Sequence, residues 1–381
     1  MRILFLLPIG EYYSREWTGA IATITRHLAR ELGAAGHDVT VLTPDDGGTL
    51  FAEGHPERLR HGSAHTPDPV TRKANSAVAR LAGWTWPDYG PYLRAVRRRL
   101  RSSGRFDAIV VANDPGTADR LARGGFAEHV VLWLHNRLEG PETRPFATMS
   151  DTVQVVAVSR AVADWTRQHF LEHTEIRVVH SGVDHELFHP RPGWLEARDP
   201  VRVVCHGRID PNKGHEVAAA AIERLRRAGL PVELTVIGEV RTFGFSQADA
   251  DEYGRSLASA VAMADGTMLG WMPHAELADQ LRQHDVACVL SRVDEPFGLV
   301  TLEAMASGCA IIATRKGGIP EAVGSAGALV PAESPDAVAE VLEAWVRDRA
   351  RLAAMKQAAV ERAADFTWAA TAAALVELLD A

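Results

Sequence analysis

Short apolar runs alternate along the chain with longer segments whose apolar residues recur every three or four positions. The short runs have the length and composition of buried strands, and the longer segments have the spacing of amphipathic helices. This alternation predicts an α/β protein with parallel sheets covered by helices on both faces. The expected strands cover residues 2–8, 39–42, 108–112, 130–134, 153–158, 201–205, 232–237, 269–272, 286–290, 310–313 and 328–330.

The chain length of 381 residues suits two domains of ordinary size, each able to bury its own core. We expect the first domain over residues 1–188 and the second over residues 200–365. Residues 191–200, with prolines near both ends, read as the linker between them. Residues 45–69 are polar and rich in Gly and Pro, which predicts a long exposed loop.

The apolar fraction of 46% and the charged fraction of 24% are those of a soluble globular protein. The longest apolar runs are too short for a signal peptide or a membrane span, so we expect a cytoplasmic protein. The three cysteines accompany apolar runs, which favours reduced core residues over disulfides or a metal cluster. Acidic and basic residues balance at 22 each through Pro190, so the net charge of −8 lies after it. A neutral first half gives no sign of a nucleic-acid partner.

The stretch from Ser291 to Glu321 carries the strongest candidate chemistry. A loop containing Glu295 follows an apolar strand, and a helical pattern starts at about Gly298. The free N–H groups and the dipole of such a helix start favour an anion. Glu295 beside that end and Glu303 inside the helix would accept hydrogen bonds from sugar hydroxyls. The pattern therefore fits a nucleotide sugar, although an ordinary surface helix start has similar residues.

A second loop carries two cations at short spacing. Gly207-Arg208 and Lys213-Gly214 follow the strand at 201–205, so the guanidinium and the ammonium would sit on one strand-to-helix loop. Arg can grip two phosphate oxygens, and Lys acts as a point charge. We interpret the loop as a diphosphate site, with a solvated basic loop as the alternative.

The first domain offers candidates at the ends of its expected strands, where parallel sheets bind ligands. Gly19, at the start of a helix, would let the backbone approach a phosphate closely, although a helix capped by Thr18 needs no ligand. His135 follows the strand at 130–134. The aromatic and acidic side chains that would suit an acceptor ring or amine, and that could equally be packing residues, are Glu11, Tyr12, Tyr13 and Trp86.

Two patterns point to other functions. His169-Phe170-Leu171-Glu172-His173 fits a zinc signature of one metalloprotease class. The segment 94–105 carries six arginines on an expected helix, which permits membrane contact, although a solvated helix face explains it more simply. A protease would also need a third zinc ligand, and it would leave the two-domain organisation unexplained.

The spacing Glu295-x7-Glu303, the run Gly317-Gly318-Ile319-Pro320-Glu321 and the Gly-Arg-x4-Lys-Gly loop resemble the retaining glycosyltransferases of family four, the glycosyl transferases group 1. The resemblance implies the GT-B fold: two Rossmann-like domains with parallel sheets facing across a cleft. The first domain would bind the acceptor and the second the nucleotide-sugar donor. The helix at 366–381 would cross back to the first domain.

The resemblance also implies roles for the residues. Catalytic contacts would come from His135, Glu295, Arg208 and Lys213. The donor would be held by Gly19, Arg208, Lys213, Glu295, Phe297, Gly298, Leu299 and Glu303, with no metal ion and no other cofactor. His135 would contact the transferred sugar, Glu295 its hydroxyls and Glu303 the ribose.

The implied reaction is transfer, with retention, of a hexosyl group from a UDP-sugar to a hydroxyl of a small acceptor. Glucose and N-acetylglucosamine are the expected sugars. The expected acceptor is a cyclitol, an aminocyclitol or another intermediate of specialised-metabolite or antibiotic biosynthesis. The alternatives are a membrane-associated transferase acting on a lipid or phosphoinositide, a GT-B nucleotide-sugar epimerase and, remotely, the zinc protease.

Overall fold

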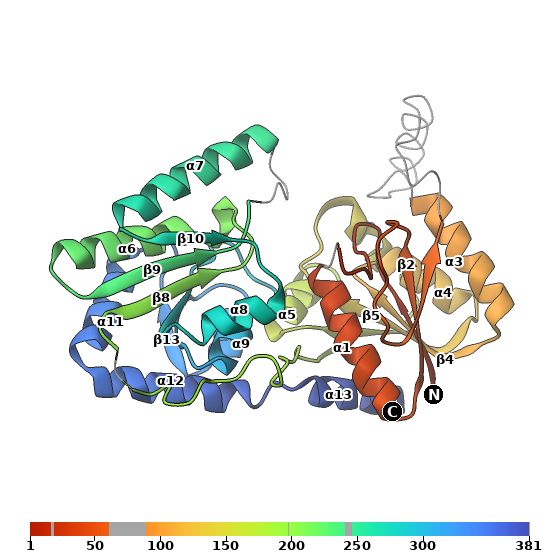
Figure 1. Ribbon diagram of the computed structural model, residues 1–381. Coiled ribbons are helices and arrows are strands. Elements are labelled where there is room, and N and C mark those ends of the chain that lie inside the picture. The colour runs from red at the N-terminus through yellow and green to blue at the C-terminus, as the bar shows by residue number, and fades with distance from the viewer. Residues whose placement is uncertain (17–18, 61–88, 197, 241–245, 381) are drawn as a thin grey trace. The chain divides into compact units, whose positions relative to one another are not determined.

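The computed structural model describes residues 1–16, 19–60, 89–196, 198–240 and 246–380 (Figure 1). The chain forms two compact units. The first domain contains Met1–Ser181 together with the chain from Trp368 onward, and the second contains Gly182–Thr367. Each unit has its own parallel sheet and its own core, so each is described by itself.

Within the described residues, the sheet of the first domain has seven strands in the order β3-β2-β1-β4-β5-β6-β7, and all neighbours pair in parallel. The strands are β1 (Arg2–Leu6), β2 (Asp38–Pro44), β3 (His55–Leu59), β4 (Phe106–Ala112), β5 (Ala127–Leu134), β6 (Val153–Ala157) and β7 (Ile176–Val178). The helices are α1 (Ala20–Ala34), α3 (Tyr89–Ser103), α4 (Pro115–Arg123), the 3₁₀ segment η1 (Gly140–Thr148), α5 (Arg160–His169) and α13 (Trp368–Asp380).

The central strand β1 pairs with β2 on one side and β4 on the other, so Ile3 lies beside both Val39 and Ala108. These positions are buried because helices cover both faces of the sheet (Figure 1). The C-terminal helix α13 packs on α1, where the rings of His27 and Trp368 stack with centroids 4.8 Å apart.

The sheet of the second domain has six described strands in the order β10-β9-β8-β11-β12-β13, again all parallel. The strands are β8 (Val201–His206), β9 (Val232–Ile237), β10 (Thr267–Gly270), β11 (Val286–Val289), β12 (Ala310–Thr314) and β13 (Gly327–Val330). The helical segments are η2 (Pro211–Lys213), α6 (His215–Arg227), α7 (Gln247–Met263), α8 (His274–Leu281), α9 (Leu299–Ala306), α10 (Ile319–Val323), α11 (Pro335–Arg347) and α12 (Arg349–Ala363).

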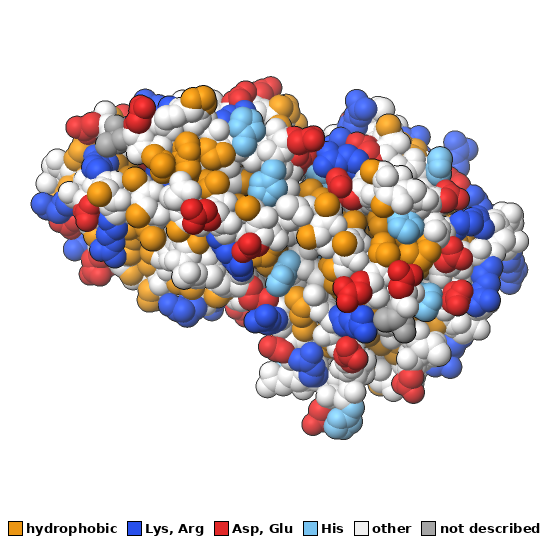
Figure 2. Space-filling view, turned by 90° about the horizontal axis from the view of Figure 1, so that it is seen from below, with side chains coloured by type: hydrophobic (Ala, Val, Ile, Leu, Met, Phe, Trp, Pro, Cys, Tyr) orange, Lys and Arg blue, Asp and Glu red, His pale blue; other side chains and the backbone are white. Residues whose placement is uncertain are grey.

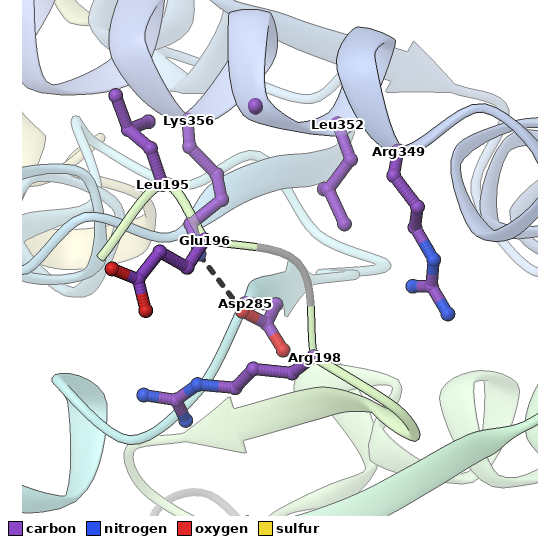
Figure 3. Close-up of a pocket in the computed structure, with 8 residues that line it drawn as sticks. Leu195, Glu196, Arg198, Asp285, Arg349, Leu352 and Lys356 are labelled. Atoms are coloured by element: carbon purple, nitrogen blue, oxygen red, sulfur yellow. Dashed lines mark hydrogen bonds and ion pairs between the residues drawn. The ribbon is translucent and has the colours of Figure 1, made fainter. Parts of the chain in front are cut away.

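A buried ion pair joins α12 to the sheet of the second domain. The Nζ atom of Lys356 lies 2.8 Å from Oδ1 of Asp285, and both side chains are almost fully buried. Figure 3 shows Lys356 reaching from its helix toward Asp285, beside Arg198. The other carboxylate oxygen of Asp285 accepts from the backbone N–H of Arg202, 3.1 Å away, so one side chain connects a helix, a strand and the turn before β11.

The described elements correct two expectations and shift a third. The predicted loop at 45–69 contains β3, which pairs with β2 in the register Thr40↔His55. Its sequence lacks an apolar alternation because it is a polar edge strand held by backbone hydrogen bonds. The strand expected at 269–272 lies at Thr267–Gly270.

The zinc-protease motif is the second correction. Helix α5 ends at His169, so His173 lies beyond it and the two histidines do not share a helix face. The Nδ1 atom of His169 is 2.7 Å from the carbonyl oxygen of Trp165, and the two rings stack. Within the described residues, no group of three His, Cys, Asp or Glu side chains is placed to hold a metal ion.

Candidate active site

Three loops meet at the carboxyl edge of the second sheet, because β8, β11 and β12 are parallel neighbours. The loop after β8 is joined to the loop after β11 by a hydrogen bond from Arg292 N–H to Asn212 O, 2.8 Å. The loop after β12 is joined to the same segment by Gly318 N–H donating to Glu295 O at 2.7 Å. The backbone therefore holds the two motifs predicted from the sequence next to each other.

The glycine pair after β12 is required by this contact. Gly317 has a φ of +54°, and a β-carbon there would lie 2.1 Å from the carbonyl oxygen of Glu295. Its N–H donates to Asp294 Oδ1 at 2.9 Å. A β-carbon at Gly318 would likewise meet Pro296 O at 2.3 Å. Side chains at these positions would push the loop that carries Glu295 out of place.

Arg208 lies two residues after the end of β8, on the loop that also carries Lys213. Its Nε donates to the buried carboxylate of Asp210, whose other oxygen accepts from Asn212 N–H at 2.9 Å and caps η2. The backbone oxygen of Arg208 lies 3.1 Å from Nε2 of the buried His215. The side chain of Arg208 is 35% exposed, so it is positioned by the loop and remains reachable by a ligand.

Lys213 and Glu295 pair with each other in this structure. Lys213 Nζ lies 2.5 Å from Glu295 Oε1, and the buried Ser291 hydroxyl donates to the same oxygen at 2.6 Å. One carboxylate thus holds the ammonium in place from a residue 82 positions away in the chain. Ser291 had no predicted role, because the sequence alone does not show that this loop turns its hydroxyl toward the Glu295 carboxylate.

Helix α9 starts directly after this loop. Gly298 is its N-cap, with φ +94°, and as a glycine it has no side chain to pair with the N–H groups of the first turn, which starts at Leu299. These N–H groups carry the positive end of the helix dipole. Phe297 is 2% exposed and packs edge-on against Phe366, with ring centroids 5.5 Å apart, which anchors the helix start in the core.

Glu303 lies on the fifth residue of α9 and faces the end of β8. Its Oε2 atom is 3.4 Å from Nε2 of His206, whose side chain is 1% exposed. Glu303 itself is 15% exposed. Sequence reasoning missed His206, although a polar residue closing a buried apolar run was a usable signal.

In the first domain, His135 follows β5 and lies next to the end of β4. Its backbone N–H donates to Asn113 Oδ1 at 2.7 Å, and its ring stacks on Trp133. Burial lowers the pKa of His135 to about 3, so the imidazole is neutral at ordinary pH. A neutral ring at the carboxyl end of a strand can donate or accept a hydrogen bond without bringing a charge.

The side chain of Glu11 lies at the start of α1, although the residue itself precedes the helix. Its carboxylate accepts from Ala22 N–H at 3.4 Å, and a β-carbon on Gly19 would lie 2.2 Å from it. Burial raises the pKa of Glu11 to about 7. Gly19 is therefore needed for a close approach to a carboxylate of the protein itself, at the place where we predicted a donor phosphate.

The other predicted acceptor residues lie in different surroundings. Tyr12 is half-buried, and desolvation together with Asp46 raises its pKa. Tyr13 is fully buried, and its hydroxyl donates to Glu53 O at 3.0 Å, so it packs in the domain core. Trp86 lies outside the described residues.

The arginine-rich helix α3 covers the first sheet with its apolar side. Val96 and Leu100 are buried, while Arg99 pairs with Glu57 of β3. The arginines at 94, 97, 98 and 101 are exposed. Acidic and basic side chains lie interspersed on the face drawn in Figure 2. Among the described helices, none combines the length and the apolar character needed to cross a bilayer.

Family models match almost the whole chain. Residues 21–187 match the model described as Glycosyltransferase Family 4, and residues 191–362 match the one described as Glycosyl transferases group 1. The chain belongs to glycosyltransferase family four. Its two parallel-sheet, Rossmann-like domains have the GT-B fold of that family.

Curated relatives of this family-four chain differ in sequence identity and in the share of each chain that the match covers. A D-inositol 3-phosphate glycosyltransferase of Segniliparus rotundus is 34% identical over 257 residues, which is 62% of this chain and 56% of that protein. A phosphatidyl-myo-inositol mannosyltransferase of Mycolicibacterium smegmatis is 27% identical over all of this chain and 94% of that protein. The chain thus spans about half the length of the inositol 3-phosphate glycosyltransferases that it matches.

Solved structures share the fold of the family-four chain over its full length. Sucrose-phosphate synthase from Thermosynechococcus elongatus superposes with a TM-score of 0.77 at 20% identity, covering 99% of this chain and 98% of that one. The Anabaena protein HepE in complex with UDP and glucose gives 0.71 at 18% identity, with both chains fully covered.

Proposed function

We propose that this family-four protein transfers a hexosyl group, with retention, from a UDP-sugar to a hydroxyl of a small cyclitol-like acceptor. One observation carries the proposal. The second domain brings Arg208, Lys213, Glu295, Glu303 and the start of α9 together on one edge of its sheet. Two cations, a helix N-terminus and two carboxylates match the diphosphate, the ribose and the hexose of a nucleotide sugar.

The proposed chemistry follows from charge development. The bond between the anomeric carbon and the diphosphate oxygen breaks, and a bond to the acceptor oxygen forms on the same face. The acceptor proton passes to the leaving phosphate. Arg208, Lys213 and the N–H groups at Gly298 and Leu299 stabilise the negative charge on that diphosphate, so this proposal needs no metal ion.

The carboxylates and the histidine are assigned to binding and orientation. Glu303 would accept from the ribose hydroxyls, and Glu295 from hydroxyls of the hexose. Lys213 would then exchange its contact with Glu295 for a phosphate oxygen, or share both. His135 would contact the transferred sugar as a neutral ring, because burial holds its pKa near 3.

Names of similar proteins support the substrate classes. Two relatives are named for an inositol phosphate and a phosphatidyl-inositol, which supports an acceptor with a cyclitol ring. A structural neighbour was solved with UDP and glucose, which supports a uridine donor. These residues do not distinguish glucose from N-acetylglucosamine, since both donors share the diphosphate and the ribose.

The first experiment is thermal stability against a panel of UDP-, GDP-, dTDP- and ADP-sugars in the presence of EDTA. We expect stabilisation by UDP-sugars. An effect confined to another nucleotide would replace uridine in the proposal, and no effect with any nucleotide sugar would contradict a donor site on the second domain.

The second experiment separates transfer from the alternatives. UDP release should depend on an added cyclitol and should persist in EDTA, and NMR of the product should show the anomeric configuration of the donor. An epimerase would convert the UDP-sugar without acceptor. A lipid-directed enzyme would release UDP with phosphoinositide vesicles and not with free inositols.

A further inference from the structure

His206 is a buried imidazole with no assigned task. It closes β8, its residue is 5% exposed, and neither ring nitrogen has a hydrogen-bond partner within the described residues. A buried polar group without a partner is costly, so such a group calls for an explanation, and a partner acquired when a ligand binds is one. A side chain near His206 that could become its partner when a ligand binds would supply that explanation.

Glu303 is the partner that the geometry offers. The two side chains come from adjacent elements, the end of β8 and the second turn of α9, and Nε2 lies 3.4 Å from Oε2. This separation is slightly longer than a good charge-assisted hydrogen bond.

The ring cannot contact a ligand itself, because its side chain is 1% exposed, whereas Glu303 is 15% exposed. A carboxylate that accepts from two vicinal hydroxyls loses less side-chain entropy on binding when it is already held in the bound orientation. A hydrogen-bond donor behind Oε2 supplies such a restraint.

We propose that His206 is a positioning residue for the nucleotide ribose. Its Nε2–H donates to Oε2 of Glu303 when the donor is bound and orients the carboxylate toward the ribose hydroxyls. The inference rests on the proposed function, and it concerns the ribose that all of the candidate nucleotide donors share.

The test compares nucleoside diphosphates with and without ribose hydroxyls. Calorimetry would measure the affinity for UDP, GDP and ADP and for their 2′,3′-dideoxy forms. His206→Phe keeps a ring of similar size and removes the donor. It should weaken binding of the ribonucleotide about tenfold or more and leave the dideoxy form unchanged.

Three further variants sharpen the result. His206→Gln, which can place an amide N–H near the position of Nε2, should recover most of the affinity. In a Glu303→Ala background, His206→Phe should cause no additional loss. His284→Phe changes another buried histidine of the same domain and should leave nucleotide affinity unchanged. With the UDP-sugar, His206→Phe should raise KM more than it lowers kcat.

Equal weakening of the ribonucleotide and its dideoxy form would overturn the inference and indicate a general structural defect. Unchanged ribonucleotide affinity in His206→Phe would also overturn it. Binding of GDP or ADP in place of UDP would correct the proposed donor while still testing His206. Failure of the wild-type protein to bind any of these nucleotides would overturn both proposals.

Discussion

Lys213 and Glu295 form an ion pair on the carboxyl edge of the second sheet, with Nζ 2.5 Å from Oε1. Both side chains are largely buried, at 23% and 13% exposure. The pair places one cation and one carboxylate of the predicted donor site in direct contact before any ligand arrives. In the proposed donor complex, a diphosphate would replace the carboxylate as the partner of Lys213, and Glu295 would accept from the hexose.

Lys213→Ala should lower turnover about 100- to 1,000-fold while the protein stays folded. The variant lacks one preorganised positive charge that would stabilise the leaving diphosphate. Steady-state kinetics with the UDP-sugar and acceptor would measure it, with circular dichroism to check folding. Arg227→Ala is the matched control, since it removes an exposed cation from an i,i+4 pair with Glu223 on α6. Equal activity of the Lys213 variant and the control would exclude the assigned role.

Gly317→Ala should disturb the loop that carries Glu295. The new methyl group would lie 2.1 Å from the Glu295 carbonyl oxygen, in addition to the cost of a positive φ. Gly229→Ala is the control, because Gly229 has φ +78° and no heavy atom within 4 Å of the added carbon. The control should lose about 1–2 kcal/mol from the left-handed backbone alone.

Urea denaturation and turnover would be measured for both glycine variants. We expect Gly317→Ala to lose more stability than Gly229→Ala and also to lose activity, since the loop and the start of α9 move together. Similar losses of stability in the two variants, with turnover unchanged, would mean that the contact to Glu295 does not hold the loop.

Glu11 should make the stability of the first domain depend on pH. The folded protein holds the Glu11 proton up to a pKa of about 7, whereas the unfolded chain releases it near the ordinary glutamate pKa of 4.5. The free energy of unfolding should therefore fall as pH rises from about 4.5 to about 7, by about 3 kcal/mol at most. Above that range the contribution is constant.

Glu11→Gln should remove this dependence, because the amide stays neutral and its oxygen can still accept from Ala22 N–H. Urea denaturation at several pH values would measure the slope. Glu128→Gln, at an exposed position of β5, should keep the wild-type slope. An unchanged slope in the Glu11 variant would show that this carboxyl group ionises normally in the folded state.

Local patterns explain why much of the fold could be predicted. The apolar runs of β8 and β11 and the spacing of Glu295 and Glu303 are properties of short segments, so the sequence displays them directly. The polar edge strand β3 was not predicted, because its stability comes from pairing with β2 and not from its own composition. Tyr13 and Tyr12 look equivalent in sequence, and only packing distinguishes the buried ring from the half-buried one.

The site itself depends on contacts between distant segments. Ser291 contacts Glu295 within a single loop, whereas Lys213 contacts it from the loop after β8. His206, at the end of β8, lies close to Glu303 of α9. Charge and spacing identify the residue types that suit a nucleotide sugar. They do not tell which carboxylate pairs with which cation, since the strand order of the sheet decides that.

Lys356→Met should destabilise the second domain by about 3–5 kcal/mol, because it leaves the Asp285 carboxylate buried without its cation. Combining it with Asp285→Asn should restore part of that loss, since the amide is neutral and still accepts from Arg202 N–H. Urea denaturation would compare both with Arg347→Met, which breaks an exposed pair with Glu343 and should cost under about 1 kcal/mol. A Lys356→Met protein as stable as the Arg347 control would show that water reaches Asp285 in solution and that the ion pair does not fasten α12 to the sheet.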